Sequence, residues 1–257
     1  MFFLKTYNQV KNLKFLLTTT IFFYSLSTWA QPIVSIEELR REGEIGNFLS
    51  SSLNLSGSSG TEERENIDFS FAANKNTDEI ESLIFINFQE RSKNNEIEDE
   101  ANFIHTRLLF KSDRLYNWEI YTQYSENPFQ LYKKRNLIGG GVRFKLEQKK
   151  RLGLSILREN EKSLINDIEI ETDRVNVYFT NALSIQENIN FNYSLFFQPS
   201  IDAFSDDYKL STLMQIEFVV NESFSINFNL GHAKDTDPPL LANETDTSYG
   251  TEFRFNF

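Results

Sequence analysis

The nine residues Tyr249-Gly-Thr-Glu-Phe-Arg-Phe-Asn-Phe257 carry the pattern that decides the fold. Phe253, Phe255 and Phe257 alternate with charged or polar residues. A period of two is typical of a β-strand with one apolar face and one polar face. A strand whose apolar face contacts lipid and whose polar face contacts a wet interior accounts for this pattern. The stretch therefore predicts a strand of a membrane-spanning β-barrel.

The same alternation recurs along the chain. Twelve segments show it, at about 44–57, 61–74, 79–92, 98–111, 116–126, 136–147, 151–161, 168–180, 188–199, 208–220, 223–233 and 249–257. Strands cross a bilayer only as a closed barrel, because every backbone polar group needs a partner within the protein. We therefore expect an all-β fold over residues 44–257, a transmembrane antiparallel up-and-down β-barrel of about twelve strands. Ten strands is the alternative, because the links at 58–60 and 93–97 are short.

The lengths of the other links indicate the orientation of the barrel. Short links are expected at 75–78, 112–115, 148–150, 181–187 and 221–222, and longer ones at 126–135, 161–167, 199–207 and 234–245. Short turns of outer-membrane barrels lie on the periplasmic side and long loops lie outside. With an even number of strands, both ends of the barrel would be periplasmic.

Residues 1–30 are expected to be a signal peptide. Three lysines precede an apolar run at 15–24, and Ser27-Thr-Trp-Ala30 offers small residues for cleavage. An uncleaved anchor is the alternative. Residues 31–43 would then form a short periplasmic N-terminal segment. Cleavage would remove three of the 26 basic residues and none of the 37 acidic ones, so the net charge would fall from −11 to −14.

The composition excludes several kinds of partner and cofactor. An acidic chain is a poor partner for nucleic acid, which needs clustered positive charge. The absence of cysteine excludes disulfides and thiolate metal sites. His105 and His232 are the only histidines, too few for a histidine metal centre. We therefore expect no cofactor.

The polar faces of the predicted strands place charges of both signs toward the interior. The candidates are His105, Arg107, Glu119, Arg143, Lys145, Arg174, Glu217, Glu252 and Arg254. Such residues can pair across a narrow barrel and fill it, or they can line a path for small solutes or ions. The first alternative predicts a structural barrel and the second a narrow channel.

A lipid-modifying enzyme of the outer membrane is a third alternative. It would need a nucleophilic serine beside a histidine. Neither His105 nor His232 has a serine two residues along on its own strand, although Ser211 or Ser223 could approach from another strand. The histidines are better explained as structural, and we expect no enzyme.

Charged loops and strand-end aromatics suggest contacts outside the barrel. Asp235, Asp237, Glu244 and Asp246 are weak candidates for a bound cation, but a solvated acidic loop explains them equally, so no metal is expected. The remaining candidates are Lys133, Lys134 and Arg135, for phosphates of outer-membrane lipids and lipopolysaccharide, and Tyr116, Trp118 and Tyr124, for an aromatic girdle at the membrane surface.

Two resemblances complete the sequence evidence. Tyr249, Gly250, Phe253, Phe255 and Phe257 resemble the C-terminal assembly signal of bacterial outer-membrane barrels, which implies the barrel-assembly machinery as a partner. Phe196-Phe-Gln-Pro-Ser200, Asp207-Tyr-Lys-Leu210, Asp235-Thr-Asp-Pro-Pro239 and Asp246-Thr-Ser248, in that order, resemble the YdiY-like family of salt-induced outer-membrane proteins over about residues 185–257. That family has no established function. The resemblance implies a stress-related, non-enzymatic barrel of the bacterial outer membrane, and our expectation is that its lumen is largely filled.

Overall fold

The computed structural model describes residues 44–58, 64–94, 96–112, 114–146 and 149–257. Within these residues the chain forms twelve strands and one short 3-10 helix. In order they are β1 (Gly46–Ser58), β2 (Arg64–Asn76), β3 (Ile80–Lys93), β4 (Glu96–Phe110), β5 (Tyr116–Asn127), η2 (Pro128–Gln130), β6 (Tyr132–Lys145), β7 (Arg151–Ser163), β8 (Glu169–Gln186), β9 (Ile189–Pro199), β10 (Tyr208–Asn221), β11 (Phe224–Asp235) and β12 (Thr245–Asn256). The predicted signal peptide and residues 31–43 lie outside the described residues.

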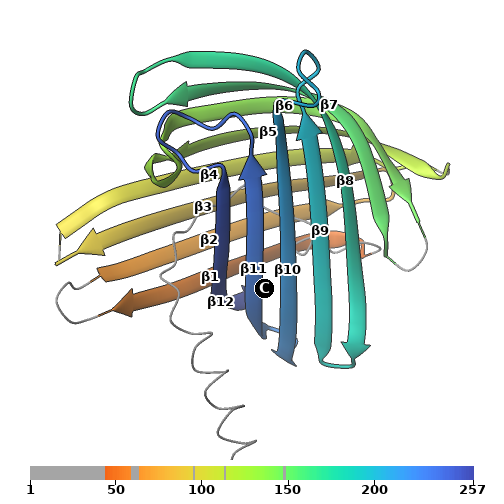
Figure 1. Ribbon diagram of the computed structural model, residues 1–257. Helices are drawn as coiled ribbons and strands as arrows, with labels where there is room; N and C mark the ends of the chain where they lie inside the picture. The colour runs from red at the N-terminus through yellow and green to blue at the C-terminus, as the bar shows by residue number, and fades with distance from the viewer. Residues whose placement is uncertain (1–43, 59–63, 95, 113, 147–148) are drawn as a thin grey trace, which may run out of the picture.

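The twelve strands form one closed barrel in which each strand pairs with its sequence neighbours and β1 pairs with β12. Every pairing is antiparallel, so the predicted up-and-down barrel is confirmed. β1 and β2 have their own ladder, as do β3 and β4, which excludes the ten-strand alternative. Figure 1 shows β1–β4 crossing the direction of β9–β11 steeply, so opposite walls of the barrel are strongly inclined to each other.

Side chains alternate between the outer face and the interior of the barrel, as β3 shows. Ile84 and Ile86 lie on the outer face, 48% and 44% exposed, whereas Leu83 and Phe85 lie inside and are buried. Large apolar residues cover the outer face of other strands in the same way, for example Phe69 and Phe253. An apolar outer face over a mostly polar interior is the arrangement that a bilayer requires of a barrel.

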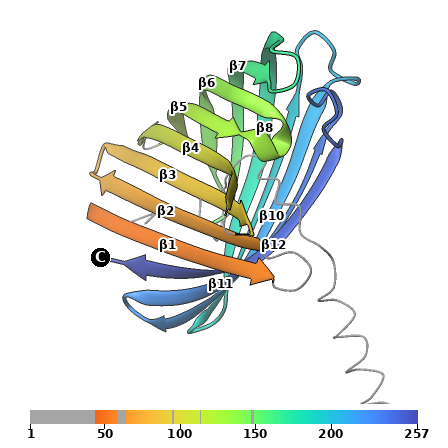
Figure 2. The same ribbon diagram turned by 90° about the vertical axis from the view of Figure 1, so that its left-hand side faces the viewer.

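The seam that closes the barrel is shorter than the other ladders. Ser50–Leu53 of β1 pair with Phe253–Asn256 of β12. One further pair of backbone hydrogen bonds joins Leu49 and Phe257. Figure 2 shows β1 beside β12 close to the C-terminus. Closure of the barrel therefore depends on the segment of β12 in which the sequence alternates most regularly.

The two ends of the barrel differ in their connections. The turn end carries both barrel termini and the connections after β2, β4, β6, β8 and β10, and the loop end carries the others. β8 continues to Gln186 before a two-residue turn, so the prediction of a link at 181–187 was wrong. The backbone of 181–186 still pairs with β9, with an irregularity between Ser184 and Gln186. None of the helices in the described ranges is long and apolar enough to cross a membrane.

Candidate functional site

A cluster of side chains occupies the middle of the barrel. Tyr178 of β8 donates its hydroxyl hydrogen to Glu119 of β5 and lies 2.8 Å from both carboxylate oxygens. Arg143 Nη1 of β6 lies 3.4 Å from the same hydroxyl, and Arg107 Nη1 of β4 lies 3.8 Å from Glu119 Oε2. All four side chains are buried. Because two strands separate β5 from β8, the Tyr178–Glu119 contact spans the interior rather than following the wall.

Neighbouring polar and aromatic side chains extend this central cluster. The hydroxyl groups of Tyr121 and Ser155 lie 2.8 Å apart, and Asn176 Nδ2 donates to both of them. Gln198 Nε2 donates to Asn176 Oδ1 at 3.1 Å. His105 stacks on Tyr121 with ring centres 6.1 Å apart. The hydrogen bonds and the stacking fix the rings in place, as expected where buried polar groups find partners.

Two glycines make room for the two interior tyrosines. Gly153 pairs directly with Tyr178, and a Cβ at Gly153 would lie 1.9 Å from the Tyr178 ring. Gly139 pairs with Tyr121 in the same way, and its Cβ would lie 2.5 Å from that ring. Each tyrosine ring therefore covers a glycine on the adjacent strand, which holds the ring against the wall and directs its hydroxyl group inward.

A second cluster, of charged side chains, lies toward the loop end and is centred on Glu159 of β7. Arg135 Nε and Lys209 Nζ donate to its carboxylate at 2.9 Å and 2.7 Å. Arg174 Nε lies 3.7 Å from the same carboxylate. Lys209 belongs to β10, three strands away from β7, so this contact also spans the interior.

Further acids complete this loop-end cluster. Lys209 Nζ lies 3.2 Å from Glu161 Oε2 and 3.3 Å from Asp235 Oδ2. Arg174 Nη1 donates to Asp207 Oδ1 at 2.8 Å. Three cations and four acids thus neutralise one another almost completely. Buried charges require such pairing, because an unpaired charge in a low-dielectric interior is costly.

A third cluster follows the inner face of β9–β12 toward the turn end. Arg254 Nε donates to Glu252 Oε1 at 2.8 Å, and Asn227 and Asn229 donate to the same carboxylate. Gln215 Nε2 donates to Asn229 Oδ1 at 2.9 Å. Asn190 Nδ2 donates to Glu217 at 2.9 Å. Amide side chains therefore link the charges of this wall along the sheet.

Among the residues that the structure describes, an open cavity lies at each end of the barrel. The loop-end cavity has about 970 Å³ of space, including its opening to solvent, and its floor includes Arg135, Glu161 and Lys209. The turn-end cavity has about 1160 Å³ and is lined by residues that include Glu217 and Arg254. Glu119, Tyr178 and Arg143 line neither cavity. The central cluster is thus separate from both open spaces.

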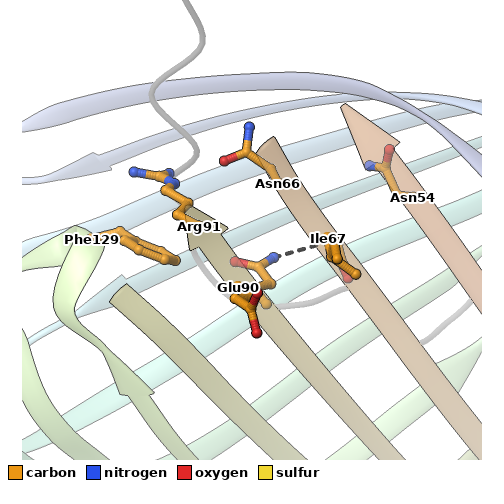
Figure 3. Close-up of a pocket in the computed structure, with 8 residues that line it drawn as sticks. Asn54, Asn66, Ile67, Glu90, Arg91 and Phe129 are labelled. Atoms are coloured by element: carbon orange, nitrogen blue, oxygen red, sulfur yellow. Dashed lines mark hydrogen bonds between the residues drawn. The ribbon is translucent and has the colours of Figure 1, made fainter. Parts of the chain in front are cut away.

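A smaller hollow lies at the loop end beside β1–β3. Arg91 lies over the ring of Phe129 at 3.8 Å, so η2 folds toward the inside of the barrel mouth. Figure 3 shows Phe129 against Arg91, with Asn66 and Asn54 on the adjacent strands. The cation–π contact holds Phe129 of η2 against Arg91 of β3.

The structure distributes the predicted interior residues among these clusters. His105, Arg107, Glu119, Arg143, Arg174 and Arg254 are buried, and Glu217 and Glu252 are half-buried. Lys145 is different: it is exposed at the turn end, where Nζ donates to the carbonyl oxygen of Ser112 at 2.8 Å. Lys145 is the last residue of β6, so its long side chain extends past the rim instead of pointing inside.

Other predicted candidates lie near the two rims. Phe253, Phe255 and Phe257 are exposed on the outer face, and Tyr249 and Gly250 are half-buried. Trp118 is 56% exposed at the turn end and packs edge-on against Tyr116, whereas Tyr124 lies near the loop end and donates to Glu126.

The basic segment at the start of β6 divides between the two faces. Arg135 is buried in the loop-end cluster, so the prediction that it meets lipid phosphates conflicts with its position. Lys133 is exposed and lies 3.5 Å from Asp167. Lys162 and Lys133 together hold the pKa of the Asp167 carboxyl below its usual value. Lys134 remains half-buried at the loop end.

The weak metal and enzyme candidates do not assemble into a site. His232 lies exposed on the outer face, where Nδ1 is 2.9 Å from Thr247 Oγ1. Its neighbour across the ladder is Thr212, so Ser211 points to the opposite face of the wall. Among the residues that the structure describes, no group of three or more acidic or histidine side chains could hold a metal ion. This includes Asp235, Asp237, Glu244 and Asp246.

Sequence reasoning missed several central residues for one reason. It named only charged residues and a histidine as interior candidates, although Tyr121, Tyr178 and Phe196 are also buried inside. Their parity within each strand could have revealed this, because Tyr178 shares the parity of Arg174. Glu159 likewise follows the inward parity of β7.

This chain is similar to several solved structures. The translocator domain of the autotransporter NalP from Neisseria meningitidis is 6% identical, with 86% of this chain and 91% of that chain covered and a TM-score of 0.48. An outer membrane channel from Pseudomonas putida F1 is 8% identical, covering 83% and 95%, with a TM-score of 0.47. The NanC porin is 4% identical, covering 82% and 98%, with a TM-score of 0.45.

No curated protein matches the sequence. Residues 52–257 match the family described as "Protein of unknown function, DUF481". This match extends over most of the barrel and confirms the resemblance to a family of barrels of unknown function that the C-terminal motifs indicated. The chain belongs to the family of proteins of unknown function DUF481.

Proposed function

We propose that this protein is a non-enzymatic barrel of the bacterial outer membrane whose interior is closed by paired charges. The observation that carries the proposal is the set of contacts that span the interior, Tyr178 with Glu119 and Lys209 with Glu159. A conducting lumen would favour charges exposed to water and dominated by one sign. Here the buried cations and acids form ion pairs with one another.

The outer-membrane location is supported by the two faces of the wall. Apolar side chains such as Ile84, Ile156 and Phe253 cover the outside, and polar side chains fill the inside. By the rule of short periplasmic turns, the turn end would face the periplasm and the loop end the outside. Lipids and lipopolysaccharide would then surround the barrel, and the barrel-assembly machinery would insert it through β12.

A role in salt stress is part of the proposal, and it rests on the resemblance noted for the C-terminal motifs. A closed barrel can strengthen the membrane without adding an ion leak. The proposal expects the amount of this protein in the outer membrane to rise when the cells that make it are moved to high salt. Quantitative blotting of membrane fractions checks this, and unchanged levels would remove the stress-related part.

The absence of enzymatic activity is supported by the positions of the histidines. His105 stacks between Phe103 and Tyr121 inside the wall, and His232 faces outward beside Thr247. Neither position offers the open serine–histidine arrangement of a lipid hydrolase. Turnover of phospholipid or lipid A that disappears in His105→Ala or His232→Ala would contradict this part.

A narrow channel is the second candidate, and the two open cavities favour it. If the central cluster were displaced, the cavities of about 970 and 1160 Å³ could join. Arg107 and Arg143 would then face the path and select for anions. This candidate requires movement of Tyr178 and its partners, whereas the closed barrel requires none.

Liposome swelling distinguishes the two candidates. Protein refolded into vesicles, shown to be folded by its heat-dependent mobility on gels, is diluted into small sugars and salts. The closed barrel predicts swelling at the rate of empty vesicles. The variant Tyr178→Ala, which removes the side chain at the centre of the cluster, is measured beside it for comparison. Swelling by the unmodified protein would favour the channel.

A further inference from the structure

The loop-end cavity contains a row of three inward positions on neighbouring strands. Ser211 of β10 pairs with Ala233 of β11, and Ala233 pairs with Asp246 of β12. All three residues line the cavity. The methyl group of Ala233 is the smallest side chain of the row. A hollow therefore separates the Ser211 hydroxyl group from the Asp246 carboxylate.

The Ser211 hydroxyl group and the Asp246 carboxylate can both form further hydrogen bonds. Ser211 is 1% exposed, and its hydroxyl oxygen has no hydrogen-bond partner in the described structure. Buried polar groups are rarely left in this state, so such a group calls for an explanation. Asp246 is half-buried and lines the same cavity. Its carboxylate forms no hydrogen bond or ion pair with any residue that the structure describes.

The charged side chains around Glu159 at the cavity floor already pair with one another. Lys209 donates to Glu159 and Glu161, and Arg135 donates to Glu159. Asp235 lies 3.3 Å from Lys209 and also accepts a hydrogen bond from the backbone of Asp237. Two further charged residues line the cavity: Lys234, whose Nζ lies 5.6 Å from the centre of the Tyr208 ring, and Glu244, whose side chain is exposed. Asp246 is therefore the half-buried acid of this row that is available to an incoming group.

The walls above this row are apolar. One side is the connection between β11 and β12, which contributes Pro238, Pro239 and Leu241. The opposite side is formed by η2 and the residue after it, with Phe129 and Leu131. Figure 1 shows the connection before β12 curving over the loop end beside η2. A ligand seated here would contact prolines and an aromatic ring with its body and the open acid with its polar end.

We propose that the loop-end cavity binds a small organic cation with an apolar body, such as a primary ammonium compound. The ammonium group would donate hydrogen bonds to the Asp246 carboxylate and the Ser211 hydroxyl group, and its apolar part would lie against the proline and phenylalanine walls. A charge-assisted bond in a partly dry site is stronger than one between neutral groups. The site does not depend on whether the barrel conducts.

Benzylammonium is a suitable probe, because it combines a primary ammonium group with one aromatic ring. Its binding to the full-length protein folded in detergent micelles is measured by isothermal titration calorimetry, with empty micelles as the blank. Benzyl alcohol and benzoate are the neutral and anionic counterparts. We expect saturable binding of benzylammonium at one site and no saturable binding of the other two.

Substitutions of single residues test whether benzylammonium binds in the loop-end cavity. Asp246→Asn keeps the size of the side chain and removes its charge, and should weaken benzylammonium binding at least about tenfold. Ser211→Ala should weaken it roughly threefold. Asp237→Asn is the matched control, because Asp237 is an exposed acid of the same connection that does not line the cavity. It should leave the affinity within about twofold.

A further variant keeps the test decisive if Asp246→Asn fails to fold. Ala233→Leu fills the hollow without changing charge and should abolish binding. The proposal is overturned if benzylammonium does not bind, if benzyl alcohol or benzoate binds equally well, or if calcium binds in its place. It is also overturned if Ala233→Leu retains full affinity, or if Asp237→Asn loses as much affinity as Asp246→Asn.

Discussion

Tyr178 donates its hydroxyl hydrogen to Glu119 at 2.8 Å, and the two residues belong to strands that are separated by two others. The contact therefore joins separate parts of the wall through the interior. Arg143 and Arg107 lie beside it, so the acid, the phenol and the two cations form one buried group. Buried polar groups of this kind stabilise a structure only when all of them are satisfied.

Tyr178→Phe tests the contribution of this hydroxyl group. The substitution leaves the buried Glu119 carboxylate without its phenolic donor, so the free energy of unfolding should fall by about 1–3 kcal/mol. Urea unfolding in vesicles, followed by heat-dependent gel mobility, measures the change. Tyr193→Phe is the control, because Tyr193 packs on Phe179 at the outer face. An equal loss in both variants would show that the interior hydrogen bond has no special role.

Glu159→Gln tests the loop-end cluster. The substitution leaves Arg135, Lys209 and Arg174 without the carboxylate they share, and should lower the free energy of unfolding by about 3–5 kcal/mol. Asp173→Asn removes an acid from an exposed pair with Arg158, in which the side chains are 41% and 58% exposed. Its cost should be about 0–1 kcal/mol. Similar unfolding midpoints for the two variants would argue against a buried cluster.

Gly153→Ala tests the packing of Tyr178 on its glycine neighbour. A Cβ would lie 1.9 Å from the ring, so the ring must move and its bond to Glu119 must break. We expect a loss of at least about 2 kcal/mol in the free energy of unfolding. Gly140→Ala is the matched control, because its Cβ would approach only the Glu119 carbonyl oxygen, at 3.3 Å. Unfolding curves that coincide would contradict the packing described here.

Trp118 reports the position of the barrel in the membrane. In a Trp29→Phe chain it is the only tryptophan. Because it lies exposed on the outer face near the turn end, its fluorescence should be quenched by lipids brominated near the headgroup and protected from aqueous iodide. Quenching by iodide with no effect of brominated lipid would place Trp118 in water and contradict a lipid-facing wall.

The sequence allowed the architecture to be predicted well, because the architecture depends on a local pattern. Alternation such as Phe253-Arg-Phe255 reports the two faces of a strand directly, and twelve such segments gave the correct number of strands. The end of β8 was missed, because the polar Asn181 interrupts the outer-face series of Val175, Val177 and Phe179, although Leu183 and Ile185 resume it.

The interior was harder to predict, because its contacts join residues distant in sequence. His105, Arg107 and Glu119 were expected inside from parity alone, but nothing local indicates that Tyr178 meets Glu119 or that Lys209 meets Glu159. Those contacts depend on the tilt of the strands and on which parts of the wall face each other across the interior. Lys145 was expected inside and is exposed, because the parity of a residue does not fix the direction of a long side chain at the end of a strand.

The most direct test of the closed interior is the single-channel conductance of the refolded protein in a planar bilayer. The paired clusters around Glu119 and Glu159 predict no steady conductance from protein shown to be folded, at any salt concentration that leaves the barrel intact. Steady openings whose conductance rises with salt would contradict the closed barrel. They would make Arg107 and Arg143 the first residues to test for ion selectivity.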